Sequence, residues 1–124
     1  MTMLTARCHC GATRIRLAHA PTSLTACNCS FCFKRGALWA YYPVGDVVVL
    51  DDAHTVGYSR DPALHTHYHC GVCGCGTHGA LRCTWTEDGP DFSAPRIAVN
   101  ARLLDDVALV EALPVDALDG RNDW

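Results

Sequence analysis

Nine cysteines in a chain of 124 residues are the feature that most limits what this sequence can fold into. They stand in tight groups and their number is odd, so a disulfide framework would leave at least one thiol unpaired. The N-terminal residues 1–17 also lack the apolar run of a secretion signal. The cysteines therefore predict metal ligation, and we expect a soluble, cytoplasmic protein. Their positions are Cys8, Cys10, Cys27, Cys29, Cys32, Cys70, Cys73, Cys75 and Cys83.

The length and charge of the chain limit the number of domains and the kinds of partner that we expect. The chain fits a single domain, residues 1–124, and its hydrophobic share of 49% is enough for a buried core. No run of eighteen apolar residues occurs, so no membrane association is expected. The formal net charge is -3 and the arginines are scattered singly, which argues against a nucleic-acid partner.

The periodicity of the chain predicts a mainly β fold with very little helix. Short runs of alternating, β-branched or aromatic residues end at turn residues. A helical turn is expected over residues 30–35 with Ser30 as N-cap, and another within residues 105–113, stopped by Pro114. Residues 84–95 lack periodicity and are predicted to be an exposed loop. The predicted strands cover residues 12–17, 37–42, 47–50, 55–59, 65–69 and 96–101.

Two cysteine pairs have the spacing of a closed metal site. Cys8 and Cys10 lie two residues apart where a strand runs into a turn, so both sulfurs can reach one ion. Cys70 and Cys73 form a knuckle whose glycines allow a tight turn. Together they predict a structural zinc bound by four thiolates, and loss of any of the four ligands is expected to unfold the domain.

The stretch CNCSFC places Cys27, Cys29 and Cys32 in six residues, which is enough to bind one ion with three sulfurs. Three protein ligands with one exchangeable position are typical of a reactive zinc site. The alternative is a second structural site that Cys75 or Cys83 completes. Because three thiolates leave Zn²⁺ with a net charge of about -1, the three-sulfur site would suit an incoming thiol better than a water to be acidified.

His65, His67 and His69 alternate along one predicted strand and therefore share a face. We interpret this row primarily as a solvated sheet face. A metal site of their own is a weaker hypothesis, as is a proton shuttle, a role that His78 could also fill.

The motifs CHCG at residues 8–11, CNCSFC and CGVCG at residues 70–74 with Thr77-His78, in this order, resemble the glutathione-dependent formaldehyde-activating enzyme family, also called the centromere-protein-V-like domain. The tail agrees in its RIAVN run at residues 96–100 and in its Asp119-Gly120 and Trp124. The resemblance implies a β-tent-like fold of antiparallel strands with two zinc ions, one structural and one catalytic. The implied catalytic ligands are Cys27, Cys29 and Cys32, and the implied structural ligands are Cys8, Cys10, Cys70 and Cys73.

The same resemblance implies a carbon–sulfur lyase activity. Its reactants would be a thiol such as glutathione and the aldehyde formaldehyde. They would condense to S-hydroxymethylglutathione, or the enzyme would catalyse the reverse cleavage. The main alternative is a non-catalytic binding domain stabilised by two structural zincs. A fourth protein sulfur beside Cys27, Cys29 and Cys32 would favour that alternative.

Overall fold

The computed structural model describes residues 3–123, and Trp124 of the tail motif lies outside them. Strands dominate, joined by short helices and two single 3₁₀ turns at Val44–Asp46 and Ala101–Leu103. The helices are α1 (Ser30–Arg35), α2 (Val107–Ala112) and α3 (Gly120–Asp123). The strands are β1 (Leu4–Arg7), β2 (Arg14–Leu17), β3 (Leu24–Cys27), β4 (Trp39–Pro43), β5 (Val47–Asp51), β6 (Thr55–Tyr58), β7 (His65–Cys70), β8 (Gly76–Leu81), β9 (Thr84–Thr86), β10 (Gly89–Asp91), β11 (Arg96–Asn100) and β12 (Val115–Leu118).

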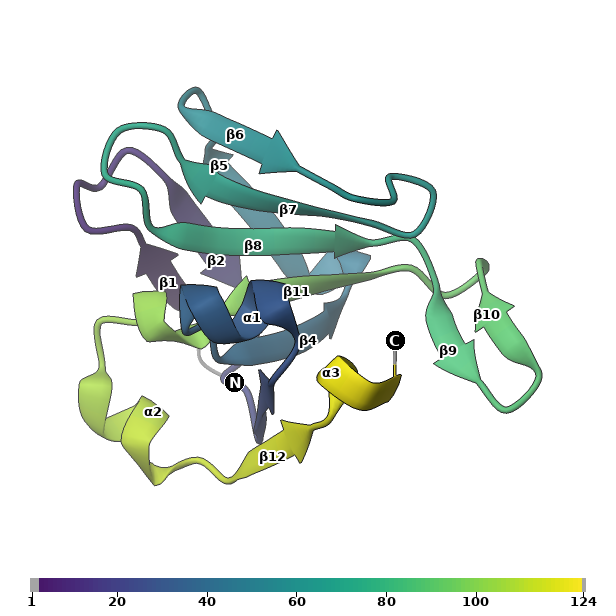
Figure 1. Cartoon of the computed structure of the whole chain (residues 1–124). Coiled ribbons are helices and arrows are strands. Elements are labelled where there is room, and N and C mark those ends of the chain that lie inside the picture. Colours follow the sequence, from purple (N-terminus) through teal and green to yellow (C-terminus); the bar gives the residue numbers. More distant parts are fainter. Residues whose placement is uncertain (1–2, 124) are drawn as a thin grey trace.

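A seven-stranded sheet forms the centre of the molecule, with the order β12-β3-β4-β11-β8-β7-β6. Its pairs are antiparallel except for β12, which runs parallel to β3. A smaller antiparallel sheet, β1-β2-β5, lies behind it in Figure 1, while α1 lies in front. The mainly β fold expected from the sequence is therefore confirmed, with one parallel pair added to it.

The main hydrophobic core fills the space between the two sheets. The smaller sheet contributes Ile15 and Leu17, and the larger sheet contributes Tyr42 and Val99, all of them nearly fully buried. Burying one such side chain contributes about 1.5–3 kcal/mol, so this layer is the main apolar source of stability.

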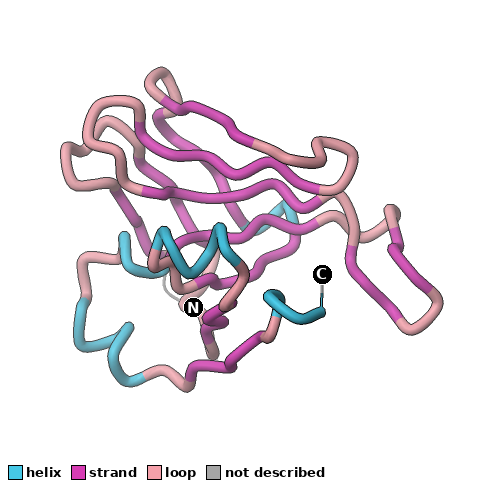
Figure 2. The backbone as a smooth tube through the Cα atoms, in the orientation of Figure 1, coloured by secondary structure: helices cyan, strands magenta, loops and turns pink. Residues whose placement is uncertain are grey.

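The opposite face of the seven-stranded sheet carries a second apolar cluster. Because side chains alternate along a strand, Ala40 and Tyr42 of β4 join the main core, whereas Trp39 and Tyr41 pack on the other face with Cys27 and Cys32. Helix α1 covers this second face, as the tube view in Figure 2 also shows. The CNCSFC stretch is thereby held against the sheet.

Two details at the helices follow from capping. Helix α1 spans the expected residues, but Cys29 and not Ser30 is its N-cap, because the Cys29 sulfur accepts a hydrogen bond from the Cys32 amide. Gly36 ends the helix with φ of 69°, a left-handed conformation that glycine adopts without strain. Helix α2 begins after Asp106, whose side chain accepts from the Leu109 amide.

The loop predicted for residues 84–95 is wrong in part, since β9 and β10 form a small hairpin within it. The hairpin projects to the right in Figure 1 and makes a sheet of its own. Its sequence has no alternation because so short a ribbon buries little of either face. Among the described residues, no helix is both long and apolar enough to cross a membrane.

Candidate metal centres

The first cysteine cluster joins the small sheet to the large one. Cys8 and Cys10 follow β1, Cys70 ends β7, and Cys73 lies in the turn that leads to β8. Their four sulfurs all lie within 4.8 Å of one another. The Cys8 and Cys10 sulfurs are 3.7 Å apart and the Cys10 and Cys70 sulfurs 3.6 Å apart.

These distances fit a zinc ion. Tetrahedral thiolates with Zn–S bonds of about 2.3 Å place their sulfurs about 3.8 Å apart, whereas disulfide sulfurs are about 2.05 Å apart. Backbone amides donate to the sulfurs, from Thr13 to Cys8 and from Val72 to Cys70. Amides from Cys75 and Cys10 lower the pKa of Cys73 to about 5, which favours the thiolate that a metal requires.

The second cluster comes from one continuous segment. Cys27 ends β3, Cys29 caps α1, and Cys32 lies in the first turn of α1, so that their three sulfurs also lie within 4.8 Å of one another. Cys27 and Cys32 are each 8% exposed. The short spacing predicted from the sequence therefore does bring the three sulfurs together.

N–H groups also surround this second cluster. The Cys29 amide donates to the Cys27 sulfur at 3.4 Å, and the Trp39 indole donates to the Cys32 sulfur at 3.3 Å. Burial raises the pKa of Cys32 to about 12, although the Trp39 N–H acts against it. Burial likewise acts to raise the pKa of Cys29, but N–H donors led by the Cys32 amide outweigh it and lower that pKa. Three adjacent thiols in this setting ionise together only around a cation.

Neither additional cysteine joins the second cluster. Within residues 3–123, no fourth histidine, cysteine, aspartate or glutamate ligand groups with Cys27, Cys29 and Cys32. Cys75 instead interacts with Cys73 of the first cluster and packs against the main core. Cys83 is a buried side chain, 3% exposed. The donor set of the second cluster is therefore three thiols.

The histidine row lies on the face that α1 covers, so its interpretation as a solvated face is wrong. The register places His67 of β7 opposite Gly79 of β8, and Gly79 opposite Ala98 of β11. The His67 ring stacks on Phe31 of α1 at a centroid distance of 4.4 Å and lies 5.7 Å from the Trp39 ring.

Small residues make this packing possible. A Cβ at Gly79 would lie 3.0 Å from the His67 Nδ1, so a larger residue would displace the ring. Burial lowers the pKa of His67 to about 4, and electrostatic interaction with His65 and with the Arg35 guanidinium acts in the same direction. His67 is therefore a neutral side chain beside the second cluster.

His78 does not belong to this face. It is 7% exposed and stacks on Tyr68 at 4.7 Å, and its register partner Val99 belongs to the main core. Its Nδ1 lies 2.9 Å from the Thr77 hydroxyl. The role of proton shuttle considered for His78 therefore has no support in its position.

The C-terminal segment fixes the CNCSFC loop. The Asn28 side chain donates to Asp119 and accepts from the Arg121 amide, and the Arg121 guanidinium donates to the Asn28 carbonyl. The segment from β12 to α3 thus holds the loop from outside. Asp119, in the tail motif, has the structural role of binding the Asn28 side chain. The sequence showed Asp119 only as part of a resemblance.

Comparison with known proteins supports the fold. The chain is similar to a Rhodobacter sphaeroides protein whose crystal structure was determined as a Northeast Structural Genomics target, with a TM-score of 0.67 and 27% sequence identity. The similarity covers 91% of this chain and 100% of that chain. No family model matches the sequence, and no curated protein matches it either. The fold thus recurs in another protein, and the function has to be argued from the site.

Proposed function

We propose that the protein binds a thiol at a zinc ion held by Cys27, Cys29 and Cys32 and adds it to an aldehyde, as the resemblance to the glutathione-dependent formaldehyde-activating enzymes implies. The observation that carries the proposal is the donor set: three sulfurs within 4.8 Å and no fourth protein ligand among residues 3–123. Zinc prefers four ligands, so an exogenous thiol can complete this set, as it could not in the first cluster.

The reaction is a simple addition. The thiol sulfur forms a bond to the aldehyde carbon, the carbonyl π bond breaks, and the thiol proton ends on the new hydroxyl group, so no oxidant or further reactant is needed. When bound, the zinc ion supplies a lowered thiol pKa and holds the sulfur in place. The protein then gains mainly from proximity between sulfur and carbon.

Side chains on the same sheet face can handle the proton. The Nδ1 atoms of His65 and His67 are buried and have no hydrogen-bond partner among the described residues. A neutral imidazole nitrogen can accept a proton in transit, and burial, which lowers the pKa of His67 to about 4, keeps this ring neutral near pH 7. Phe31 and Trp39, which pack against His67, would keep water from the site.

Zinc-edge X-ray absorption on the purified protein tests thiol binding. With four sulfurs at one zinc and three at the other, the mean should rise from about 3.5 to about 4 sulfurs per zinc when glutathione is added. Cys29→Ala should remove the response. Two zincs with four sulfurs each before glutathione is added, and no change afterwards, would contradict the proposal and favour two structural sites.

Turnover is tested separately by exchange NMR with ¹³C-formaldehyde and glutathione. The protein should speed exchange between free formaldehyde and S-hydroxymethylglutathione above the spontaneous rate. Cys29→Ala, at equal concentration, should return the exchange to that rate. Equal exchange with and without the wild-type protein would refute the lyase activity while leaving thiol binding to the absorption experiment.

A further inference from the structure

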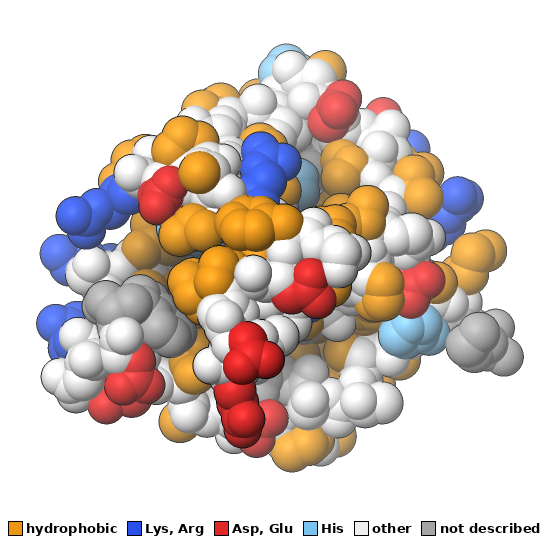
Figure 3. Space-filling model, turned by 90° about the vertical axis from the view of Figure 1, so that its right-hand side faces the viewer, with side chains coloured by type: hydrophobic (Ala, Val, Ile, Leu, Met, Phe, Trp, Pro, Cys, Tyr) orange, Lys and Arg blue, Asp and Glu red, His pale blue; other side chains and the backbone are white. Residues whose placement is uncertain are grey.

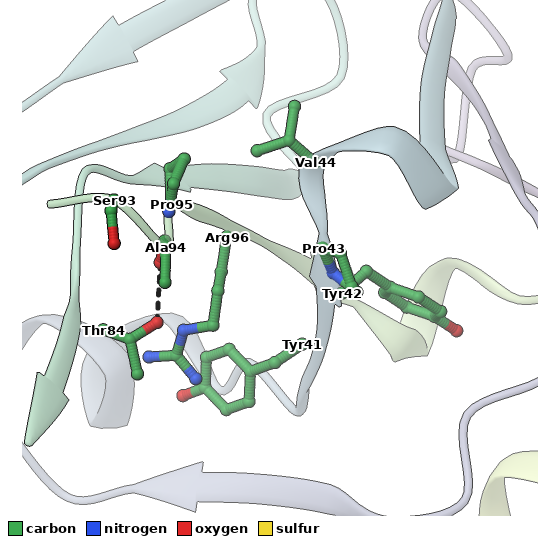
Figure 4. Close-up of a pocket in the computed structure, with 9 residues that line it drawn as sticks. All are labelled: Tyr41, Tyr42, Pro43, Val44, Thr84, Ser93, Ala94, Pro95 and Arg96. Carbon is green, nitrogen blue, oxygen red and sulfur yellow. Dashed lines mark hydrogen bonds between the residues drawn. The ribbon is translucent and has the colours of Figure 1, made fainter. Parts of the chain in front are cut away.

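A cavity of about 600 Å³ lies where β4 ends and β11 begins. Its walls come from β4 and from the segment that leads from the β9–β10 hairpin into β11 (Figure 4). In Figure 3, which views the molecule from the hairpin side, hydrophobic side chains gather in the upper middle of the face beside a basic side chain, with acidic side chains below them. The lining residues are Tyr41, Tyr42, Pro43, Val44, Thr84, Ser93, Ala94, Pro95 and Arg96.

Among the described residues that line the cavity, Arg96 alone carries a charge. Its guanidinium carbon lies 4.7 Å from the centroid of the Tyr41 ring, and Figure 4 shows the group lying over that ring. Within residues 3–123, Arg96 has no salt-bridge partner, and its buried Nε has no hydrogen-bond acceptor. Such an unpaired buried donor costs about 1–3 kcal/mol, and residues 3–123 supply no acceptor that would offset this cost.

Three hydroxyl groups of the lining are already engaged, and that of Tyr42 donates to the His19 carbonyl at 3.0 Å. Thr84 donates to the Ala94 carbonyl at 2.6 Å, and Ser93 donates to Asp91 at 2.6 Å. Arg96 is therefore the side chain best placed to supply N–H donors to a ligand, and a guanidinium matches the two oxygens of a carboxylate. One positive charge among apolar walls suits a monoanion rather than a phosphate.

Tyr41 connects the cavity to the second cysteine cluster. It lines the cavity and also packs against the group that contains Cys27 and Cys32. Ala98 of β11 is the register partner of Tyr41 and belongs to the same cluster as Cys27 and Cys32. The cavity and the cluster are therefore neighbours on one sheet face.

We propose that this cavity is the subsite for a carboxylate of the thiol substrate, with Arg96 binding the carboxylate while the thiol reaches Cys27, Cys29 and Cys32. The inference rests on the proposed function and adds to it the place where a carboxylate of the thiol would bind, which favours thiols that carry a carboxylate over neutral thiols. Arg96 is in this view a specificity-determining residue.

Calorimetric titration of the zinc-loaded protein with glutathione and with its dimethyl ester tests the subsite. The wild type should bind glutathione about ten- to a hundredfold more tightly than the ester, as expected for a hydrogen-bonded charge pair. Arg96→Met should bind both with the affinity of the ester, and Arg96→Lys, which keeps the charge and loses the planar fork, should lie between. Arg60→Met, at an exposed arginine, is the matched control and should behave as the wild type.

Two outcomes would overturn the subsite: equal binding of acid and ester by the wild type, or an equal loss for both in Arg96→Met. S-methylglutathione separates this failure from failure of the proposed function, because it has the carboxylates and no free thiol. Binding of S-methylglutathione that depends on Arg96, without any zinc-edge response to glutathione, would support the carboxylate subsite and refute thiol binding at zinc. A zinc-edge response to glutathione combined with equal binding of acid and ester would support thiol binding at zinc and refute the carboxylate subsite.

Discussion

Trp39→Phe should weaken zinc binding at the second cluster and leave zinc binding at the first cluster unchanged. The Trp39 indole donates to the Cys32 sulfur at 3.3 Å, and the side chain is only 3% exposed. Phenylalanine keeps most of the buried ring but removes the donor. A hydrogen bond to a charged acceptor contributes about 1.5–3 kcal/mol, which corresponds to about ten- to a hundredfold in zinc affinity.

Chelator competition measures this effect. Zinc retained per chain is determined while a chelator of known affinity is increased, and the wild type should lose its two zincs in two steps. Trp39→Phe should move only the step that belongs to the second cluster. Trp85→Phe, at a tryptophan that is 63% exposed, is the control and should change neither step. Unchanged release from Trp39→Phe, or an equal shift of both steps, would refute the reasoning.

Three further predictions concern ligands and pH. Cys70→Ala should lose the structural zinc and with it about 10 kcal/mol, comparable to the stability of a whole domain, so thermal melting should show no cooperative transition; a folded variant would refute the structural role. Cys29→Ala should stay folded and contain about one zinc per chain by elemental analysis, whereas unfolding would show that the second cluster also supports the fold. Finally, the free energy of unfolding, measured by urea titration, should fall as pH drops from about 6.5 toward about 4. Burial holds the pKa of His67 and His78 near 4 in the folded state, so the unfolded chain takes up these protons first. His67→Gln should reduce this slope by about one proton, and the exposed His54→Gln should not; equal slopes would contradict the burial argument.

The cysteine clusters could be found in the sequence because their ligands are close along the chain. Cysteines two or three residues apart in a turn or at a helix start can bind the same ion independently of the rest of the fold. The sequence alone therefore predicted the clusters at CNCSFC and at Cys70 and Cys73. The pairing of Cys8 and Cys10 with the knuckle needed only that two loops meet. Zinc as the metal, and the catalytic role of the second cluster, stay predictions.

Several strands were less visible. Strand β8 has the sequence GTHGAL, whose glycines have low strand propensity, yet it pairs along its length with β7 and β11. Strands β1, β3 and β12 have the sequences LTAR, LTAC and VDAL, each with a single β-branched residue and no aromatic residue, so their strand propensity is weak. Tertiary pairing forms these strands, so local preference could not reveal them.

The surroundings of the second cluster depend on register across four strands, which no local pattern contains. Antiparallel register sets Arg96 beside Pro43, Ala98 beside Tyr41, and His67 opposite Gly79. Only this register brings the Arg96 guanidinium and the half-buried His67 imidazole to the face that carries the cysteines. A shift of β11 by one residue would turn Arg96 into the main core and Val99 toward the sulfurs, so the apolar core also fixes the site. In the sequence, this register is indicated only by the small residues Gly79 and Ala98. They leave space on the buried sheet face for the His67 ring and for α1. Burial of Val99 in the main core and the placement of Arg96 in the cavity are thus two results of the same strand register.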